Sequence, residues 1–328
     1  MYIFEAKALF TFVFSFFVTL YLVPIFSKIA FKWGILDSPD GKLKKHKAAI
    51  PYLGGVAVWL SFLITCSLVL PFENQFFLYI FASTILLFIG LVDDLIALTP
   101  SQKIFGQFLA ILCYLKAGFY LKINFFSNVW NIFISAFWFL SIINAFNLID
   151  VMDGLASTVA ISVAVFFLIF AFCLKQTSLI LLLLAFIGSL SAFLCFNKPS
   201  AKMYLGDAGS LFIGGFIASI PFCLSWSEYN FYGYFIPLIL CAVPLIEMFT
   251  LICVRTLKRQ PFFCGSPDHF SIFLQEKGWS KYLILIFSFL TTFLLGVLSF
   301  LFFYNYLSLS FILSLGILVI FIWFFLLL

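Results

Sequence analysis

The chain has 328 residues, of which 65% are hydrophobic, 21% aromatic and 9% charged. A soluble domain carries roughly a quarter charged residues, so this composition excludes a soluble globular protein. The formal net charge of +5 would suggest nucleic acid as the partner of a soluble protein. In a membrane protein it fits basic cytoplasmic loops, and we expect no nucleic-acid partner.

Apolar runs recur along the whole chain, each about 20 residues long, which is the length that crosses a ~30 Å hydrocarbon layer. Their centres lie near residues 17, 61, 84, 110, 139, 165, 187, 218, 244, 292 and 318. They predict an all-α polytopic membrane protein with about 10–11 transmembrane helices. The first run has no basic start and no small-residue cleavage site, so we expect it to remain as a span. We expect one integral-membrane domain over residues 1–328.

Lys and Arg are distributed unequally between the two sides that this alternation defines. One side receives segments 28–50, 93–103, 150–154, 197–209 and 255–281, which hold fourteen of the eighteen Lys and Arg residues. The positive-inside rule places this side in the cytoplasm. All eight aspartates and both histidines also lie there, although that rule scarcely acts on acids. We infer that this face is built for chemistry or for binding a cation.

The first cytoplasmic loop reads ILDSPDGKLKKHKAAIPYLGG and carries Lys45 and His46. Such residues contact an anionic substrate, or they mark the cytoplasmic side and pack within the loop.

An acid pair follows in GLVDDLIALTPSQK, where Asp93 and Asp94 end a span and Lys103 comes nine residues after the second aspartate. A carboxylate at the bilayer centre costs roughly 2.5–3.5 kcal/mol, so these acids lie at an interface or face a polar cavity. Adjacent carboxylates repel each other unless a cation or a proton separates them. The pair is a cation or substrate site, or a solvated interfacial turn beside a lysine that extends to the interface.

The segment NAFNLIDVMDG places Asn144, Asn147, Asp150 and Asp153 at steps of three residues. Each step rotates by about 300° on an α-helix, so the first and last side chains would lie about 180° apart. For all four to converge, the helix must unwind near Asp150, and the following glycine permits this. The alternative is an ordinary helix end rich in Asn and Asp.

Two later loops complete the polar face. In MYLGDAGSLFIGG, glycines flank Asp207 and allow the backbone to approach a phosphate, or Asp207 caps the next helix. Arg255 and His269 lie in the longest loop, which reads RTLKRQPFFCGSPDHFSIFLQEKGWSK. They bind phosphate, or Arg255 marks the cytoplasmic side of the membrane and His269 packs within the loop. Oxygen ligands without a Cys or His cluster favour Mg²⁺ or Mn²⁺, and the nearby cations indicate chemistry on a diphosphate.

These motifs, in this order, resemble those of the polyprenyl-phosphate N-acetylhexosamine-1-phosphate transferases, glycosyltransferase family 4, the group of MraY, WecA and TagO. The matching stretches are DSPDGKLKKHKAAIPYLGG, GLVDDLIAL with Lys103, NAFNLIDVMDGLA, YLGDAGSLFIGG, and PLIEMFTLICVR with SPDH. The resemblance implies that a lipid phosphate oxygen attacks the β-phosphorus of a UDP-sugar. UMP leaves, and the lipid-diphosphate-sugar starts cell-envelope glycan synthesis, such as that of lipopolysaccharide or teichoic acid.

The resemblance also implies roles for individual residues. The catalytic group is Asp93, Asp94, Lys103 and His269. The ligands of Mg²⁺, or possible Mn²⁺, are Asp207 and Asn147. The substrate-binding group is Asn144, Asp150, Asp153, Tyr204, Arg255, Lys45 and His46.

Within these groups, the acid pair would position and deprotonate the lipid phosphate, and Lys103 would neutralise phosphate charge. Tyr204 would stack on uracil. Arg255 and His269 would face the diphosphate or the sugar.

Two positions depart from the family pattern. Ala97 replaces the third acid of the acid-pair motif, and the histidine-rich loop keeps only His269. IPYLGG and SPDH favour the WecA-type branch and transfer of GlcNAc-1-phosphate, whereas EKGW resembles the phospho-N-acetylmuramoyl-pentapeptide branch, which we keep as the alternative. A secondary transporter is the alternative from another class, although here the acids gather on one face without repeats.

The expected partners are a UDP-N-acetylhexosamine, undecaprenyl or another polyprenyl phosphate, and the bilayer, with a homodimer left open. The expected location is a bacterial inner membrane, with the site facing the cytoplasm.

Overall fold

The computed structural model describes residues 2–37, 49–71, 73–261 and 266–327. Its α-helices are α1 (Tyr2–Trp33), α2 (Gly54–Val69), α3 (Asn74–Ile96), α4 (Pro100–Lys116), α5 (Asn128–Ile149), α6 (Leu155–Cys173), α7 (Thr177–Asn197), α8 (Gly206–Ser219), α9 (Ile236–Leu240), α10 (Ala242–Leu257), α11 (Phe270–Glu276), α12 (Lys281–Phe303) and α13 (Leu309–Leu327). Short 3₁₀ helices are η1 (Ile220–Cys223) and η2 (Gly233–Phe235), and the strands β1 (Leu36–Asp37) and β2 (Ile50–Pro51) form an antiparallel pair.

The all-α polytopic class is confirmed, and every predicted span centre lies within a helix. In the described residues, seven helices are long and apolar enough to cross a membrane, or eight if the pair Gly233–Leu240 and Ala242–Leu257, bent by 69°, is one span. The centres near 61 and 110 fall in the shorter helices α2 and α4, of 16 and 17 residues.

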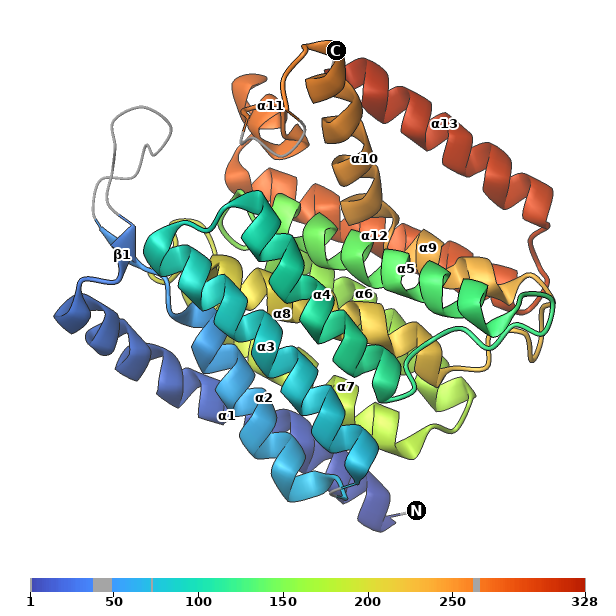
Figure 1. The fold of residues 1–328 in the computed structure, drawn as a ribbon, viewed down its shortest axis with the longest axis horizontal. Helices are drawn as coiled ribbons and strands as arrows, with labels where there is room; N and C mark the ends of the chain where they lie inside the picture. The colour runs from blue at the N-terminus through green and yellow to red at the C-terminus, as the bar shows by residue number, and fades with distance from the viewer. Residues whose placement is uncertain (1, 38–48, 72, 262–265, 328) are drawn as a thin grey trace.

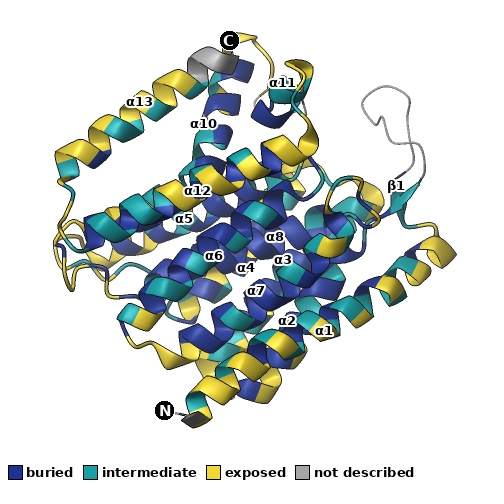
Figure 2. Cartoon of the chain, turned by 180° about the vertical axis from the view of Figure 1, so that it is seen from behind, coloured by how far each residue is buried: buried dark blue, intermediate teal, exposed yellow. Residues whose placement is uncertain are grey.

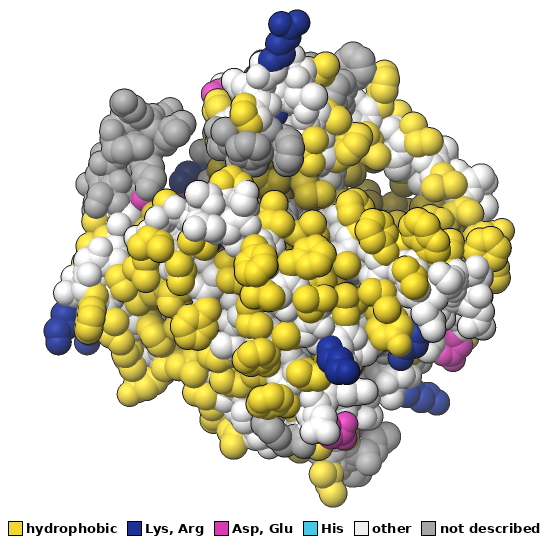
Figure 3. Space-filling model, in the orientation of Figure 1, with side chains coloured by type: hydrophobic (Ala, Val, Ile, Leu, Met, Phe, Trp, Pro, Cys, Tyr) yellow, Lys and Arg dark blue, Asp and Glu magenta, His cyan; other side chains and the backbone are white. Residues whose placement is uncertain are grey.

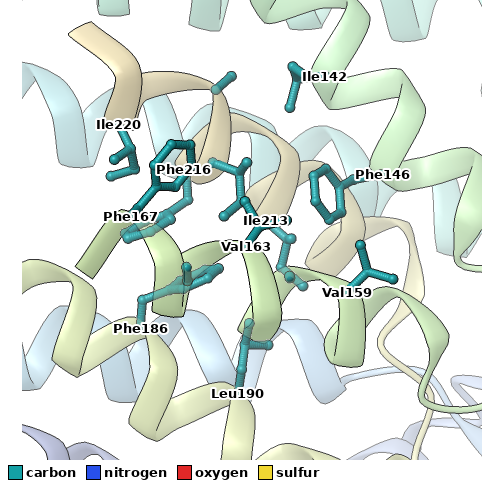
Figure 4. Close-up of a cluster of buried hydrophobic side chains, with 14 of the residues drawn as sticks. Ile142, Phe146, Val159, Val163, Phe167, Phe186, Leu190, Ile213, Phe216 and Ile220 are labelled. Atoms are coloured by element: carbon teal, nitrogen blue, oxygen red, sulfur yellow. The ribbon is translucent and has the colours of Figure 1, made fainter. Parts of the chain in front are cut away.

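Helix α8 lies at the centre of the bundle and packs against α2, α3 and α5. Figure 4 shows its core, where Ile142 and Phe146 of α5 and Val163 of α6 surround Ile213 of α8. Phe186 of α7 stacks on Phe216 of α8, with ring centroids 3.7 Å apart. Every residue of α8 except Asp207 is buried, so the helix offers one polar side chain to the outside.

Helix α8 lies deep in the bundle because its backbone comes very close to the backbones of α2 and α3. A Cβ on Gly90 of α3 would lie 2.3 Å from the backbone of Asp207, and one on Gly55 of α2 would lie 2.2 Å from Gly209. Small residues permit helices to pack at such distances. The crossing at Gly90 sets the distance from the end of α3 to the start of α8.

The outer surface is apolar. In Figure 2 exposed residues gather on α1, α12 and α13, and buried ones at α6, α7 and α8. Figure 3 shows hydrophobic side chains over the face of α3, α4 and α5, with charged groups near its margins. Exposed Phe77, Phe81, Phe105 and Phe133 belong to this surface, which suits contact with lipid chains. Helix α13 lies beside the bundle, against α10.

Candidate active site

The turn between α3 and α4 brings the acid pair back toward Lys103. Ala97 has a left-handed backbone (φ 49°), and the Leu98 N–H donates to Asp93 Oδ1 at 2.7 Å. Thr99 and Gln102 form a capping box that starts α4, so Lys103 lies in its first turn. Its Nζ is 2.8 Å from Asp93 Oδ2. This contact shows that the acid pair and Lys103 form one unit.

Lys103 joins three other helices. Its ammonium donates to Asn147 Oδ1 on α5 at 3.1 Å and forms an ion pair with Asp207 Oδ2 on α8. Asn147 Nδ2 donates to the other Asp207 oxygen and to Ser210 Oγ, each at 2.9 Å. We call Asp93, Asp94, Lys103, Asn147 and Asp207 the acid cluster. The structure thus brings together five residues that the sequence singled out.

Asp94 has a different place in this cluster from Asp93. Its two oxygens accept the N–H groups of Asp207 at 2.9 Å and Ala208 at 3.2 Å, so it caps the N-terminus of α8 from another helix. Gly206 (φ 72°) leaves room for it, because a Cβ there would lie 2.6 Å from Asp94 Oδ2. The alternative that Asp207 is the N-cap is wrong, since Asp207 lies inside the first turn.

The helix breaks near Asp150, as both interpretations of the sequence require. Helix α5 ends at Ile149, Asp150 follows as its C-cap, and Gly154 (φ 76°) precedes α6. Asn197 braces this turn, because its Oδ1 accepts the Gly154 N–H at 3.0 Å and its Nδ2 donates to Met203 O at 2.9 Å. The turn therefore faces the segment that contains Tyr204.

Asn144 does not share the contacts of Asn147. Its amide pairs with Gln107 of α4 in both directions, at 3.2 and 2.8 Å, and donates to Leu140 O. The sequence reading missed Gln107, whose position one helical turn after Lys103 is a signal that it faces the same way.

Tyr204 and Tyr52 lie with Asp37, Asp150 and Asp153, which we call the tyrosine group. The two rings have centroids 6.3 Å apart, and the Tyr52 hydroxyl donates to Asp37 Oδ1 at 2.8 Å. Burial and the charges of Asp153, Asp37 and Asp150 raise the pKa of Tyr204 to about 12. Burial and the charges of Asp207, Asp94 and Asp153 also raise the pKa of Asp150. The charges of Asp94 and Asp207 in the acid cluster therefore act on the tyrosine group, which shows that the two groups are close.

The sequence reading missed Tyr52 and Asp37, which flank the first cytoplasmic loop. It also missed the partner of Asp153, whose Oδ2 accepts a 2.9 Å contact from Lys281 at the start of α12. Lys45 and His46 lie outside the residues that the structure describes.

Arg255 and His269 form a separate group. Arg255 is buried on α10 and its Nε donates to Ser266 Oγ at 2.9 Å. His269 precedes α11 and lies beside the buried Glu247, which the sequence reading also missed. Within the described part of the chain, no hydrogen bond or ion pair joins His269 to the acid cluster.

Oxygen donors for a divalent cation converge at Lys103. Asp207 and Asn147 both direct oxygens at its ammonium, so they already surround a positive charge. Across the described ranges no group of three or more His, Cys, Asp or Glu side chains forms a metal site. Mg²⁺ commonly uses one or two carboxylates together with substrate phosphates and water, so this donor set fits it.

Comparisons with known proteins agree with this chemistry. The model of glycosyl transferase family 4 matches residues 76–225, which contain the whole acid cluster. A phospho-N-acetylmuramoyl-pentapeptide-transferase of Clostridium perfringens (strain SM101 / Type A) is 30% identical over 299 residues, 82% of this chain and 88% of that protein. The chain belongs to the polyprenyl-phosphate N-acetylhexosamine-1-phosphate transferase family.

Two other relatives of the transferase carry a different name. A probable undecaprenyl-phosphate N-acetylglucosaminyl 1-phosphate transferase of Bacillus subtilis (strain 168) is 26% identical over 298 residues, 87% of this chain and 82% of that protein. An undecaprenyl-phosphate alpha-N-acetylglucosaminyl 1-phosphate transferase of Thermotoga maritima is 28% identical over 282 residues, 85% of this chain and 87% of that protein. The enzyme class is confirmed, and the transporter alternative fails.

Proposed function

We propose that this transferase moves GlcNAc-1-phosphate from UDP-GlcNAc to undecaprenyl phosphate or a similar polyprenyl phosphate. The observation that carries the proposal is the acid cluster, in which Lys103 is held by Asp93, Asn147 and Asp207 at the ends of apolar helices. The sugar follows from the WecA-type motifs and from the names of the Bacillus and Thermotoga relatives.

The reaction exchanges one phosphorus–oxygen bond for another. An oxygen of the lipid phosphate attacks the β-phosphorus, and the bond from that phosphorus to the bridging oxygen breaks. The bridging oxygen leaves with UMP. Such a transfer needs charge neutralisation and positioning more than covalent help from the protein. Lys103 supplies a positive charge at the centre of the cluster.

The contacts of Asp93 and Asp94 support different roles for these two aspartates. Asp94 holds the N-terminus of α8, so we assign it the positioning of Asp207. Asp93 contacts Lys103 and the α3–α4 turn, and we assign it the lipid phosphate, whose remaining proton it accepts.

Asp207 and Asn147 would hold Mg²⁺ or Mn²⁺. When bound, this ion supplies positive charge to the diphosphate. Lys103, which pairs with Asp207 in this structure, has a flexible side chain that could reach the phosphates.

The tyrosine group is the proposed nucleotide site. Tyr204 offers a ring to uracil, and Asp150 and Asp153 lie beside it. Asn144 is tied to Gln107, so we assign it the support of Asn147 one turn away. Arg255 and His269 would meet the diphosphate or sugar, and Lys45 and His46 remain proposed substrate contacts.

We also propose that the site faces the cytoplasm of a bacterial inner membrane. The support is the excess of Lys and Arg on the side that carries the acid cluster.

The test is incubation of purified protein with undecaprenyl phosphate and a panel of UDP-sugars, read by mass spectrometry of the lipid. UDP-GlcNAc should give lipid-diphosphate-GlcNAc and equimolar UMP. A product only from UDP-N-acetylmuramoyl-pentapeptide would assign the enzyme to the other branch, to which the Clostridium relative belongs by name.

A further inference from the structure

Glu247 is a buried carboxylate on α10 that the proposed chemistry does not use. Its side chain is 1% exposed. Oε1 accepts the Phe270 N–H at 3.0 Å, and Oε2 accepts the Trp323 indole N–H at 3.2 Å. Burying a carboxylate is costly unless donors satisfy it. These two donors come from α11 and α13, so Glu247 joins three helices.

The same carboxylate faces His269. Oε1 lies 3.2 Å from His269 Nδ1, off the direction of a hydrogen bond, so the negative carboxylate faces this ring nitrogen directly. A carboxylate only accepts protons, which favours the imidazole form that carries hydrogen on Nδ1. Nε2 is then the nitrogen left for a substrate. Further charged side chains on these elements and their ends are Arg255 on α10, Lys258 at its C-cap, Asp268 before α11 and Glu276 at the exposed end of α11.

Trp323 ties the C-terminal helix to this arrangement. Besides its bond to Glu247, its ring lies 4.9 Å from that of Phe270. Apolar cavities of about 100 and 230 Å³ border it, and Thr291 and Val319 line both. Figure 3 shows the surface hollowed beside α13. Because cavities border Trp323, its contacts with Glu247 and Phe270 are what hold α13 against α10 and α11 at this point.

We propose that Glu247 is a positioning residue, which sets the tautomer and direction of His269, and that Trp323 holds Glu247 in place. We call Glu247, His269, Phe270 and Trp323 the histidine clamp. The inference rests on the proposed function in one respect, namely that His269 meets the diphosphate or sugar. It adds that the C-terminal helix controls this contact without touching substrate.

The first test is a double-mutant cycle with UDP-GlcNAc and undecaprenyl phosphate. Glu247→Gln should lower kcat about tenfold, as loss of an orienting partner does for metal-bound histidines. In a His269→Ala background it should change kcat by less than about twofold, because the residue through which it acts is gone. Equal losses in both backgrounds would show a merely structural role and overturn the proposal. Glu276→Gln, at the exposed end of α11, is the matched control.

The second variant, Trp323→Phe, keeps an aromatic ring and removes the indole N–H together with the pyrrole part of the ring. It should lower kcat about threefold in the parent chain and leave the His269→Ala variant unchanged. Trp130→Phe, on an exposed indole, is the control. An unchanged kcat of the Trp323→Phe variant would show that α13 does not act on His269 through Glu247.

A third measurement does not depend on turnover. The chain has two histidines, so ¹⁵N-histidine labelling gives two imidazole spectra, and His46→Gln assigns them. His269 should show hydrogen on Nδ1, and Glu247→Gln should shift its Nδ1 resonance. An Nε2–H form that Glu247→Gln does not alter would overturn the positioning role. This outcome is distinct from failure of the proposed function, which would appear as no lipid product with intact histidine spectra.

Discussion

The acid cluster and the histidine clamp are built in different ways. The cluster stands at the ends of α3, α4, α5 and α8, where helices approach closely at Gly90. The clamp lies on α10, α11 and α13, beside apolar cavities. Close-packed interiors do not yield to small shifts, whereas loosely packed elements move more easily. We propose that the closely packed acid cluster carries the phosphoryl transfer and that the more loosely packed clamp presents the sugar or diphosphate contact.

The largest expected effect tests the acid cluster. Asp207→Asn should lower kcat by at least about 10²–10³, because the proposed ligand of the cation and partner of Lys103 loses its charge. Glu228→Gln, at an exposed position between η1 and η2, beyond the C-terminal end of α8, should stay within about twofold of the parent. Initial rates at saturating UDP-GlcNAc measure both, and similar modest losses in the two variants would contradict the assignment.

The next effect tests whether the close helix crossing matters for chemistry. Gly90→Ala forces α3 and α8 apart, since a Cβ there lies 2.3 Å from the Asp207 backbone. A misplacement of about 1 Å can cost about 10² in rate, so kcat should fall by about that factor. Gly316→Ala meets nothing within 4 Å and should be silent. Parent-like activity of Gly90→Ala would show that the cluster tolerates a looser crossing.

A smaller effect belongs to the tyrosine group. Tyr204→Ala removes a stacking surface worth roughly 1–3 kcal/mol on a nucleobase. The KM for UDP-GlcNAc should rise about tenfold or more with a smaller change in kcat, and Tyr204→Phe should stay near the parent. Steady-state kinetics measures this change. An unchanged KM would show that uracil does not stack on Tyr204.

The smallest effect lies in the loop before α11. Although burial raises it, the hydrogen bond and charge of Lys258 keep the pKa of Asp268 below its ordinary value. The ion pair therefore stabilises the fold at neutral pH, and its contribution is lost as the pH falls through the lowered pKa. Lys258→Gln should reduce thermal stability by less than about 1 kcal/mol at pH 7, because Lys258 is half-exposed. A larger loss of stability would show that this loop is held as firmly as the acid cluster, which would contradict the comparison between the two regions.

Local signals in the sequence indicated most of the residues that come together in the acid cluster. The unwinding at Asp150 followed from the spacing of four polar residues, and the class followed from apolar runs. The roles of Lys103, Asp207 and Tyr204 came from the resemblance to the transferases.

Contacts across the bundle were beyond such reasoning. Asp94 and the amide that it caps are 113 residues apart, and Asp153 and Lys281 are 128 apart. The pairing of Asn144 with Gln107, and of Glu247 with His269 and Trp323, depends on how helices rotate against each other. Periodicity indicates which face of a helix is apolar and does not specify its partner.

The most direct test of the account measures binding and turnover on one variant, Asp93→Asn. The acid cluster is assigned the chemical step and the tyrosine group the nucleotide. Calorimetric titration with UDP-GlcNAc and Mg²⁺ should give a Kd within about threefold of the parent, while kcat falls by about 10² or more. Loss of UDP-GlcNAc binding, or retention of turnover, would contradict the division between the two groups.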